Sequence, residues 1–256
     1  MVRNPVCAAI GSILLAAALL GAQTARAAGE KMVLARPFKA GVTTTYKATI
    51  KANVQGMDIV LEQSQKQTIK TVKDNGNYVV YSEDLGGTIK LNGTDQEQKP
   101  SPPSTETRDK LGKLLDFVHE ADPSAIFAPE IQKLMTTISE LITTDKEVAE
   151  GDSWETMLDN PASKDNKAKV KTTYQGIDKV DGVDLWKFKQ TAEAVVNADG
   201  SKMVNESTIW INPKDGMMEK IDGKVKDIPT QLGPFDIAIV INRVKAPAAG
   251  DTKAAK

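Results

Sequence analysis

The sequence predicts a mainly antiparallel β fold with a central helical insertion, an α+β arrangement. Apolar and polar residues alternate with a period of two through a first block, residues 28–95, and again through a second block, residues 150–244. Between the blocks, residues 106–145 carry apolar residues at helical spacing. Short turns rich in Gly and Asn join the alternating segments, as in an antiparallel meander. We therefore expect a curved sheet or half-barrel covered by two amphipathic helices.

The first block opens with a strand over residues 44–54. Tyr46 and Ile50 point to one face of this strand, whereas Lys47 and Lys51 point to the other. The chain then turns at Gln55-Gly56, and the sequence Asp-Asn-Gly-Asn at 74–77 is a strong hairpin signal because Asn and Gly adopt positive φ at low cost. The block thus predicts successive hairpins with one wet face.

The central segment changes period after a proline-rich break at residues 96–109. A first helix is predicted from residues at i, i+3, i+4 and i+7, namely Leu111, Leu114, Leu115 and Val118. A second is predicted to begin near Pro129, and its apolar stripe is Ile131, Leu134, Met135, Ile138, Leu141 and Ile142. Isolated helices of this length are marginal in water, so both should dock on the apolar face of the sheet.

The second block returns to strands separated by turns at Asp181-Gly182, at Asp199-Gly200 and at residues 213–216. Trp186 and Phe188 share one face of their strand. Trp210 is flanked by Ile209 and Ile211, so alternation does not decide its face. A last strand is expected from Phe235 onward. Residues 28–244 are therefore expected to form a single β-rich domain.

The N-terminus predicts export. Residues 1–27 read as a signal peptide, with basic Arg3, an apolar run over residues 6–22, and Ala25 and Ala27 at the spacing that signal peptidases recognise. The alternative is an uncleaved N-terminal anchor, since the run is at the short limit for a membrane span. The protein should be periplasmic or extracellular and soluble after cleavage near Ala27. Residues 245–256 are small and polar and predict a disordered tail.

The composition narrows the class of protein. Cys7, within the predicted signal peptide, is the only cysteine, so the mature domain must rely on its own core. This fits a bacterial periplasm or exterior better than a disulfide-stapled secreted domain. The formal net charge is −1 and the lysines are scattered, which gives no reason to expect binding to nucleic acid.

The sequence predicts no catalytic residues, no metal and no cofactor. Gly-Asp-Ser-Trp at 151–154 resembles the opening of the GDSL hydrolase motif, but the only histidine, His119, lies upstream of that serine. His119 with Glu120 and Asp122 would make a poor transition-metal site. The aspartates at 178, 181 and 184 lack the spacing of a calcium loop. We therefore expect a non-enzymatic protein.

One hairpin supplies a resemblance. Residues 207–225, STIWINPKDGMMEKIDGKV, form a strand ending in an aromatic residue, an Asn-Pro-x-x-Gly turn and an apolar-led strand. This hairpin resembles one in the LolA/LppX-like envelope proteins of bacteria, and the first block is similar to exported bacterial domains of unknown function. The resemblance implies an exported half-barrel whose concave apolar face takes up lipid chains.

Two functions follow as expectations. In the first, the concave face binds an apolar ligand such as a lipid acyl chain, and the expected ligand-binding residues are Tyr46, Ile50, Trp186, Phe188, Trp210 and Met217. In the second, the protein is an envelope structural or protein-interaction module with a filled core, an envelope protein as partner and no small-molecule ligand. The sequence leaves the oligomeric state open.

Overall fold

The structure is a computed structural model that describes residues 30–120, 127–230 and 233–244. The predicted signal peptide and the predicted tail lie outside these ranges. The elements given below belong to the compact unit that begins at Lys31. Within the described ranges, no helix is long and apolar enough to cross a membrane.

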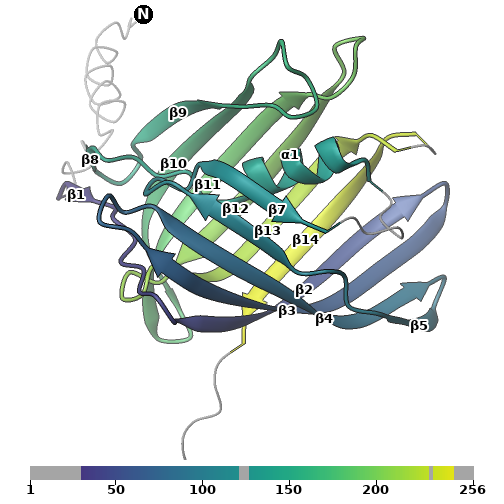
Figure 1. The fold of residues 1–256 in the computed structure, drawn as a ribbon, viewed down its shortest axis with the longest axis horizontal. Helices are drawn as coiled ribbons and strands as arrows, with labels where there is room; N and C mark the ends of the chain where they lie inside the picture. The colour runs from purple at the N-terminus through teal and green to yellow at the C-terminus, as the bar shows by residue number, and fades with distance from the viewer. Residues whose placement is uncertain (1–29, 121–126, 231–232, 245–256) are drawn as a thin grey trace, which may run out of the picture. The chain divides into compact units, whose positions relative to one another are not determined.

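The described residues form fourteen strands and one helix (Figure 1). Before the helix lie β1 (Met32–Val33), β2 (Thr43–Val54), β3 (Met57–Val72), β4 (Tyr78–Leu91), β5 (Thr94–Gln98), β6 (Ser104–Arg108) and β7 (Leu114–His119). The helix is α1 (Pro129–Ser139). After it lie β8 (Glu147–Val148), β9 (Ser153–Leu158), β10 (Ala168–Val180), β11 (Val183–Val195), β12 (Lys202–Ile211), β13 (Met218–Ile228) and β14 (Phe235–Arg243).

Twelve strands make one open antiparallel sheet. Their order is β7-β6-β4-β3-β2-β14-β13-β12-β11-β10-β9, with β5 paired to β4. The strands before the helix, β2 to β7, meet the strands after it, β9 to β14, where β14 pairs with β2. Strand β7 therefore belongs to the sheet, although it lies within the predicted helical insertion, residues 106–145. Strands β7 and β9 are the two edges, and β1 pairs with β8 in a separate small sheet. The predicted antiparallel β architecture is therefore confirmed, together with the predicted hairpin turns.

The helix covers one face of the sheet, which we call the inner face. Pro129 stands at its first positions, where its missing N–H costs no hydrogen bond. Ile131, Leu134 and Ile138 are buried and pack with side chains from β9 to β14, such as Met203. The chain leaves the helix at Glu140, whose backbone is extended. The predicted stripe thus begins in a helix and ends beyond it, because Leu141 and Ile142 are buried in the extended segment that follows.

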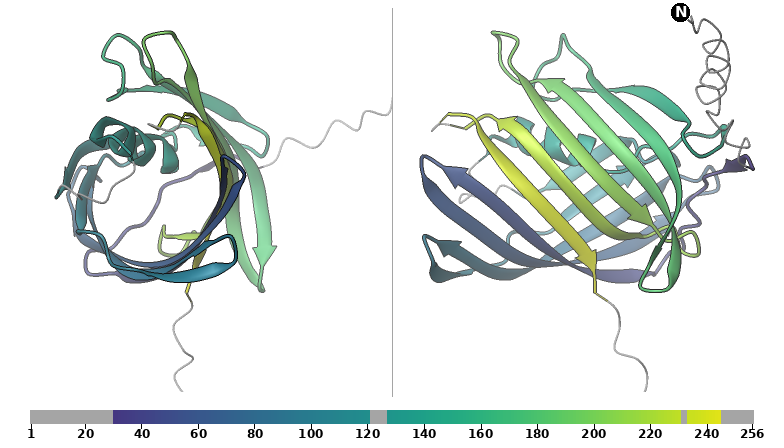
Figure 2. Two further views of the ribbon diagram at one scale, coloured as in Figure 1. Left: turned by 90° about the vertical axis from the view of Figure 1, so that its right-hand side faces the viewer. Right: turned by 180° about the vertical axis from the view of Figure 1, so that it is seen from behind.

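Hydrogen bonds tie the helix to strands that precede it and to strands that follow it in the sequence. Arg108 of β6 donates to the carbonyl oxygen of Thr136 (2.9 Å), and Asn205 of β12 donates to that of Ile138 (3.2 Å). Gln190 of β11 donates to the carbonyl of Glu140 (2.8 Å) and accepts from the N–H of Ile142 (2.9 Å). The helix therefore lies between strands that are far apart in the sheet order, as the left view of Figure 2 also shows.

The other predicted helix is wrong. Residues 109–119 form the tight turn between β6 and β7 and then β7 itself. The Asp109 carboxylate accepts hydrogen bonds from the N–H groups of Leu111 and Lys113 (both 2.9 Å), which fixes the turn. Gly112 has a φ of 97°, and a Cβ there would lie 2.3 Å from the carbonyl oxygen of Leu141. Four apolar residues in a short run fit both a helix and a strand, and the turn chemistry decides between them.

Candidate functional site

The predicted ligand-binding residues fall into separate parts of the sheet. Phe188 is fully buried and Trp186 half-buried in a cluster with Ile209 and Leu34. Tyr46 and Met217 are buried in another cluster, with Tyr78. Ile50 is half-buried at the margin of the helix cluster. The strand registers place Tyr46, Ile50, Trp186 and Phe188 on the same inner face, but protein side chains already cover most of them.

Trp210 lies on the opposite, outer face. It pairs with Lys187 of β11 and Lys220 of β13, whereas Phe188 pairs with Ile209. The two lysine ammonium groups lie 5.4 and 5.0 Å from the Trp210 ring centroid. The indole N–H donates to Asp178 (2.9 Å), and this bond is the main cause of the lowered pKa of the Asp178 carboxyl. Trp210 is therefore held by polar partners and does not share a surface with Phe188.

A row of aliphatic side chains on the inner face of β2, β3, β4 and β14 is only half-buried. Leu61 stands opposite both Ile50 and Ile89, and Ile239 stands opposite Ile50. We call this surface the aliphatic face, and its members are Ile50, Ile59, Leu61, Ile89, Leu91 and Ile239. Of these six, the sequence predicts only Ile50 as a ligand-binding residue, although the alternation of β3, β4 and β14 places the others on the same face. The aliphatic face is thus an ordered apolar surface that the described part of the chain covers only in part.

Polar side chains continue this inner face along β3. Gln63 pairs with Ala48, and Gln65 pairs with Tyr46, so both lie on the same side as Leu61. The Gln67 amide donates to the Gln65 oxygen (3.2 Å). All three glutamines are half-buried. The inner face therefore changes from aliphatic to neutral polar within one strand.

Farther along the same face lies a cluster of ion pairs. Arg36, in the segment before β2, pairs with Glu140 at the end of the helix and donates to the carbonyl of Gly216 (2.8 Å). Burial disfavours the charged Glu140 carboxylate, but the guanidinium groups of Arg36 and Arg108 outweigh this effect and lower its pKa. Arg108 pairs with Glu106 (2.6 Å) and donates to the carbonyl of Gly112 (2.9 Å). These contacts hold the segment before β2, which contains Arg36, and the C-terminal end of the helix against the sheet.

A third arginine and two phenols border this cluster. Arg243 of β14 pairs with Asp215 (2.8 Å) and with Glu219 (2.9 Å) in and after the turn between β12 and β13. Burial raises the pKa of the Tyr46 and Tyr78 phenols, which stay neutral. Sequence reasoning missed all the arginines here. No periodic pattern marks a buried ion pair whose members are, like Arg36 and Glu140, 104 residues apart.

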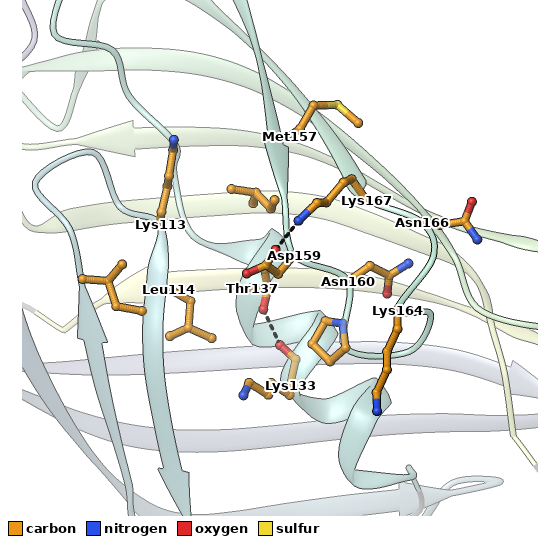
Figure 3. A pocket seen from close by; sticks show the side chains of 13 residues that line it. Lys113, Leu114, Lys133, Thr137, Met157, Asp159, Asn160, Lys164, Asn166 and Lys167 are labelled. Atoms are coloured by element: carbon orange, nitrogen blue, oxygen red, sulfur yellow. Dashed lines mark hydrogen bonds and ion pairs between the residues drawn. The ribbon is translucent and has the colours of Figure 1, made fainter.

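A cleft of about 470 Å³ opens between the two edge strands, over the helix (Figure 3). Lys113 and Leu115 come from the β7 side, Met157 and Lys167 from the β9 side, and Lys133 from α1. The loop after β9 adds Asp159, Asn160, Lys164 and Asn166. Lys167 pairs with Asp159 (2.5 Å), the only acidic residue among the described residues that line the cleft. The cleft is thus basic, and part of its wall is apolar.

The described residues that the sequence raised as candidates for catalysis, Ser153 and His119, contact other side chains instead. The Ser153 hydroxyl of the Gly-Asp-Ser-Trp sequence is 2.8 Å from the hydroxyl of Thr173, its neighbour on β10. His119 lies on β7, where its ring stacks with Phe117. Across the ranges that the structure describes, no group of three or more His, Cys, Asp or Glu residues could hold a metal. Among the described residues, neither Ser153 nor His119 has a partner suited to nucleophilic catalysis.

Comparison with known proteins leaves the family unassigned. No family model and no curated protein matches the sequence. Among solved structures, similar chains are the hypothetical lipoprotein YmcC from Escherichia coli K12 (12% identity, covering 84% of this chain and 91% of that one, TM-score 0.24) and a DUF1329 family protein from Desulfovibrio piger (11%, 82% and 87%, TM-score 0.25). A third is a domain from Vibrio parahaemolyticus assigned as an outer membrane lipoprotein-sorting protein (7%, 81% and 86%, TM-score 0.22). Similarity at these TM-scores decides neither the fold nor the function of this chain.

Proposed function

We propose that the protein is an exported, non-enzymatic carrier that holds an apolar ligand, such as a lipid acyl chain, against the aliphatic face. One observation carries this proposal. Six aliphatic side chains stand in register on the inner face and are only half-buried, whereas the helix seals the same face of β10 to β13. A contiguous apolar surface that keeps part of its area in water is typical of a binding site.

The chemistry of the surface favours a long apolar ligand. Burial of apolar area stabilises a complex by roughly 25 cal/mol per Å², and the aliphatic face offers no charged group that a small metabolite would need. The neutral row of Gln63, Gln65 and Gln67 could accept hydrogen bonds from, or donate them to, a polar group at one end of the ligand. An ester or carboxyl group next to an acyl chain has this character.

The proposed function implies a cellular location for the protein. A carrier of acyl chains with a cleaved signal peptide at residues 1–27 would act in the bacterial envelope, and its sheet would serve as a half-barrel around the ligand. The LolA/LppX-like resemblance of residues 207–225 agrees with this role. The alternative is an envelope interaction module with a filled core. The tight packing around Phe188, Tyr46 and Met217 favours that alternative for the remainder of the inner face.

A fluorescent acyl probe separates the two functions. The chain without residues 1–27 would be titrated with cis-parinaric acid, and the increase in probe fluorescence measured. The test variant is Leu61→Asp, and the matched control is Val60→Asp, the adjacent half-buried residue that points to the outer face. We expect saturable binding that Leu61→Asp weakens by more than tenfold and Val60→Asp leaves nearly unchanged.

Two results would contradict the carrier. Either no probe binds, or both variants bind it equally well. In those cases the interaction module would be the better description. Native mass spectrometry on protein purified from its own envelope provides an independent check, because a carrier should retain a co-purifying lipid that organic extraction removes.

A further inference from the structure

The geometry points to a membrane-docking function for the cleft between β7 and β9, on a bilayer surface that contains anionic phospholipid. This inference rests on the proposed function, because a carrier of acyl chains has to reach a membrane to collect or deliver them. Its evidence is separate, because none of the residues of the aliphatic face lines the cleft.

The charge of the cleft is the first argument. Among the described residues that line it are four lysines, Lys113, Lys133, Lys164 and Lys167, and one acidic residue, Asp159. Within the described part of the chain, only Lys167 of the four is in an ion pair, with Asp159. The protein as a whole has a formal net charge of −1, so overall charge supplies no attraction to an anionic surface. Any such attraction must come from a local concentration of lysines like this one.

The arrangement of the lysines is the second argument. Figure 3 shows that their side chains stand around the cleft instead of converging on one point. A single small anion is best bound by donors that converge on it. Lysines spread over a surface suit an array of phosphate groups, because each ammonium can meet a different headgroup.

Exposed apolar side chains beside the lysines are the third argument. Leu115 is 56% exposed and Met157 is 57% exposed, and they come from opposite walls of the cleft. Large apolar side chains next to lysines are typical of surfaces that enter the interfacial layer of a bilayer. The open backbone edges of β7 and β9 limit the depth, because unpaired N–H and C=O groups are costly in hydrocarbon. Docking is therefore at headgroup depth.

Vesicle co-sedimentation tests this inference on the chain without residues 1–27. The probes are vesicles of phosphatidylcholine alone and vesicles of phosphatidylcholine with phosphatidylglycerol. We expect binding only to the anionic vesicles, weakening as salt rises because the ammonium–phosphate attraction is screened. The variant Lys133→Gln/Lys164→Gln should lower the affinity roughly ten- to thirtyfold. The variant Leu115→Ser/Met157→Ser should also weaken binding and leave the salt dependence unchanged.

The matched control is Lys47→Gln/Lys189→Gln, which removes the same charge from exposed positions on the outer face of β2 and β11. It should bind like the unmodified chain. Equal losses in the cleft variant and the control, equal binding to both vesicle types, or binding to an acidic peptide such as polyglutamate without binding to vesicles would each overturn the inference. A folded protein that binds vesicles but no acyl probe would refute the carrier alone, and the reverse result would refute docking alone.

Discussion

The inner face is largely covered by protein along β10 to β13 and only partly covered along β2 to β4 and β14. The same alternation of apolar and polar residues produces both parts. Along β10 to β13, inward residues such as Met203 and Phe188 are fully buried, packed against the helix or the segments flanking it. Along β2 to β4 and β14, inward residues such as Leu61 and Ile239 are only half-buried. Alternation sets which side chains point inward, whereas the path of the helix sets which of them are sealed. The comparison shows that an apolar row can be core in one place and a candidate binding surface in another.

The strongest test of the comparison places a charge on each part. Ile138→Asp puts a carboxylate between the helix and β12, and we expect a loss of several kcal/mol in the free energy of unfolding. Ile239→Asp, on the aliphatic face, should cost much less because its carboxylate can reach water. Urea denaturation of both variants measures the two losses. Equal losses would mean that the two surfaces are covered alike.

Removing a charge from the ion-pair cluster should have the next largest effect. Glu140→Gln leaves Arg36 without its partner, and we expect a loss of about 2–3 kcal/mol, below the range for a fully buried pair because Glu140 keeps some exposure. In the unmodified protein the folded-state pKa of Glu140 lies below its ordinary value of 4.5. The pair's contribution is therefore complete above that value and is lost as the pH falls through the lowered folded pKa.

Denaturation at a series of pH values checks this sign. The unmodified protein should have a larger free energy of unfolding than Glu140→Gln at neutral pH, and this difference should disappear as the pH is lowered below about 4.5. A difference that is the same at pH 7 and pH 3 would contradict the ion-pair explanation.

A smaller contrast is expected when methylene groups are removed without adding charge. Leu134→Ala should cost about 3 kcal/mol, since the Leu134 side chain is fully buried between the helix and the sheet. Leu61→Ala should cost about 1 kcal/mol or less, because its side chain already keeps part of its surface in water. If a carrier ligand is bound, added acyl probe should raise the melting temperature of the unmodified protein more than that of Leu61→Ala.

The smallest effect concerns the outer face. Trp210→Phe removes the indole donor to Asp178, so the pKa of the Asp178 carboxyl should rise toward its ordinary value. Titration of the aspartate side chains by NMR measures this change. Acyl-probe binding should be unaffected, because Trp210 points away from the aliphatic face. A loss of probe binding in this variant would challenge the assignment of the two faces.

The local sequence pattern predicted most of the strands and their turns. It did not predict which segments cover the faces of the sheet. Alternation over residues 44–54 predicted β2, and the glycine turns predicted the hairpins. The same method failed at Leu111 to Val118, where a turn held by Asp109 overrode an apparent helical period. It also could not place Trp210, whose neighbours are apolar on both sides. The strand register resolved that face, and register depends on pairing between distant segments.

Contacts across long stretches of sequence account for the remaining gaps. Arg36 pairs with Glu140, and the aliphatic face joins strands from β2 to β14. No local signal marks such partners. Of the predicted ligand-binding residues, the structure keeps Ile50 on the half-open surface and places Trp210 on the other side of the sheet.

The position of β14 has a consequence for the order of assembly. It is the last described strand in the sequence, yet it stands in the middle of the sheet, between β13 and β2. The edge of β2 therefore has no partner until more than 180 residues have followed it, and closing so long a loop is slow. A chain that is still emerging would keep two separate hairpin arrays with unpaired edges. In an exported chain, the late arrival of β14 would leave the sheet incomplete during translocation. Strand β14 would then complete the sheet as its central strand.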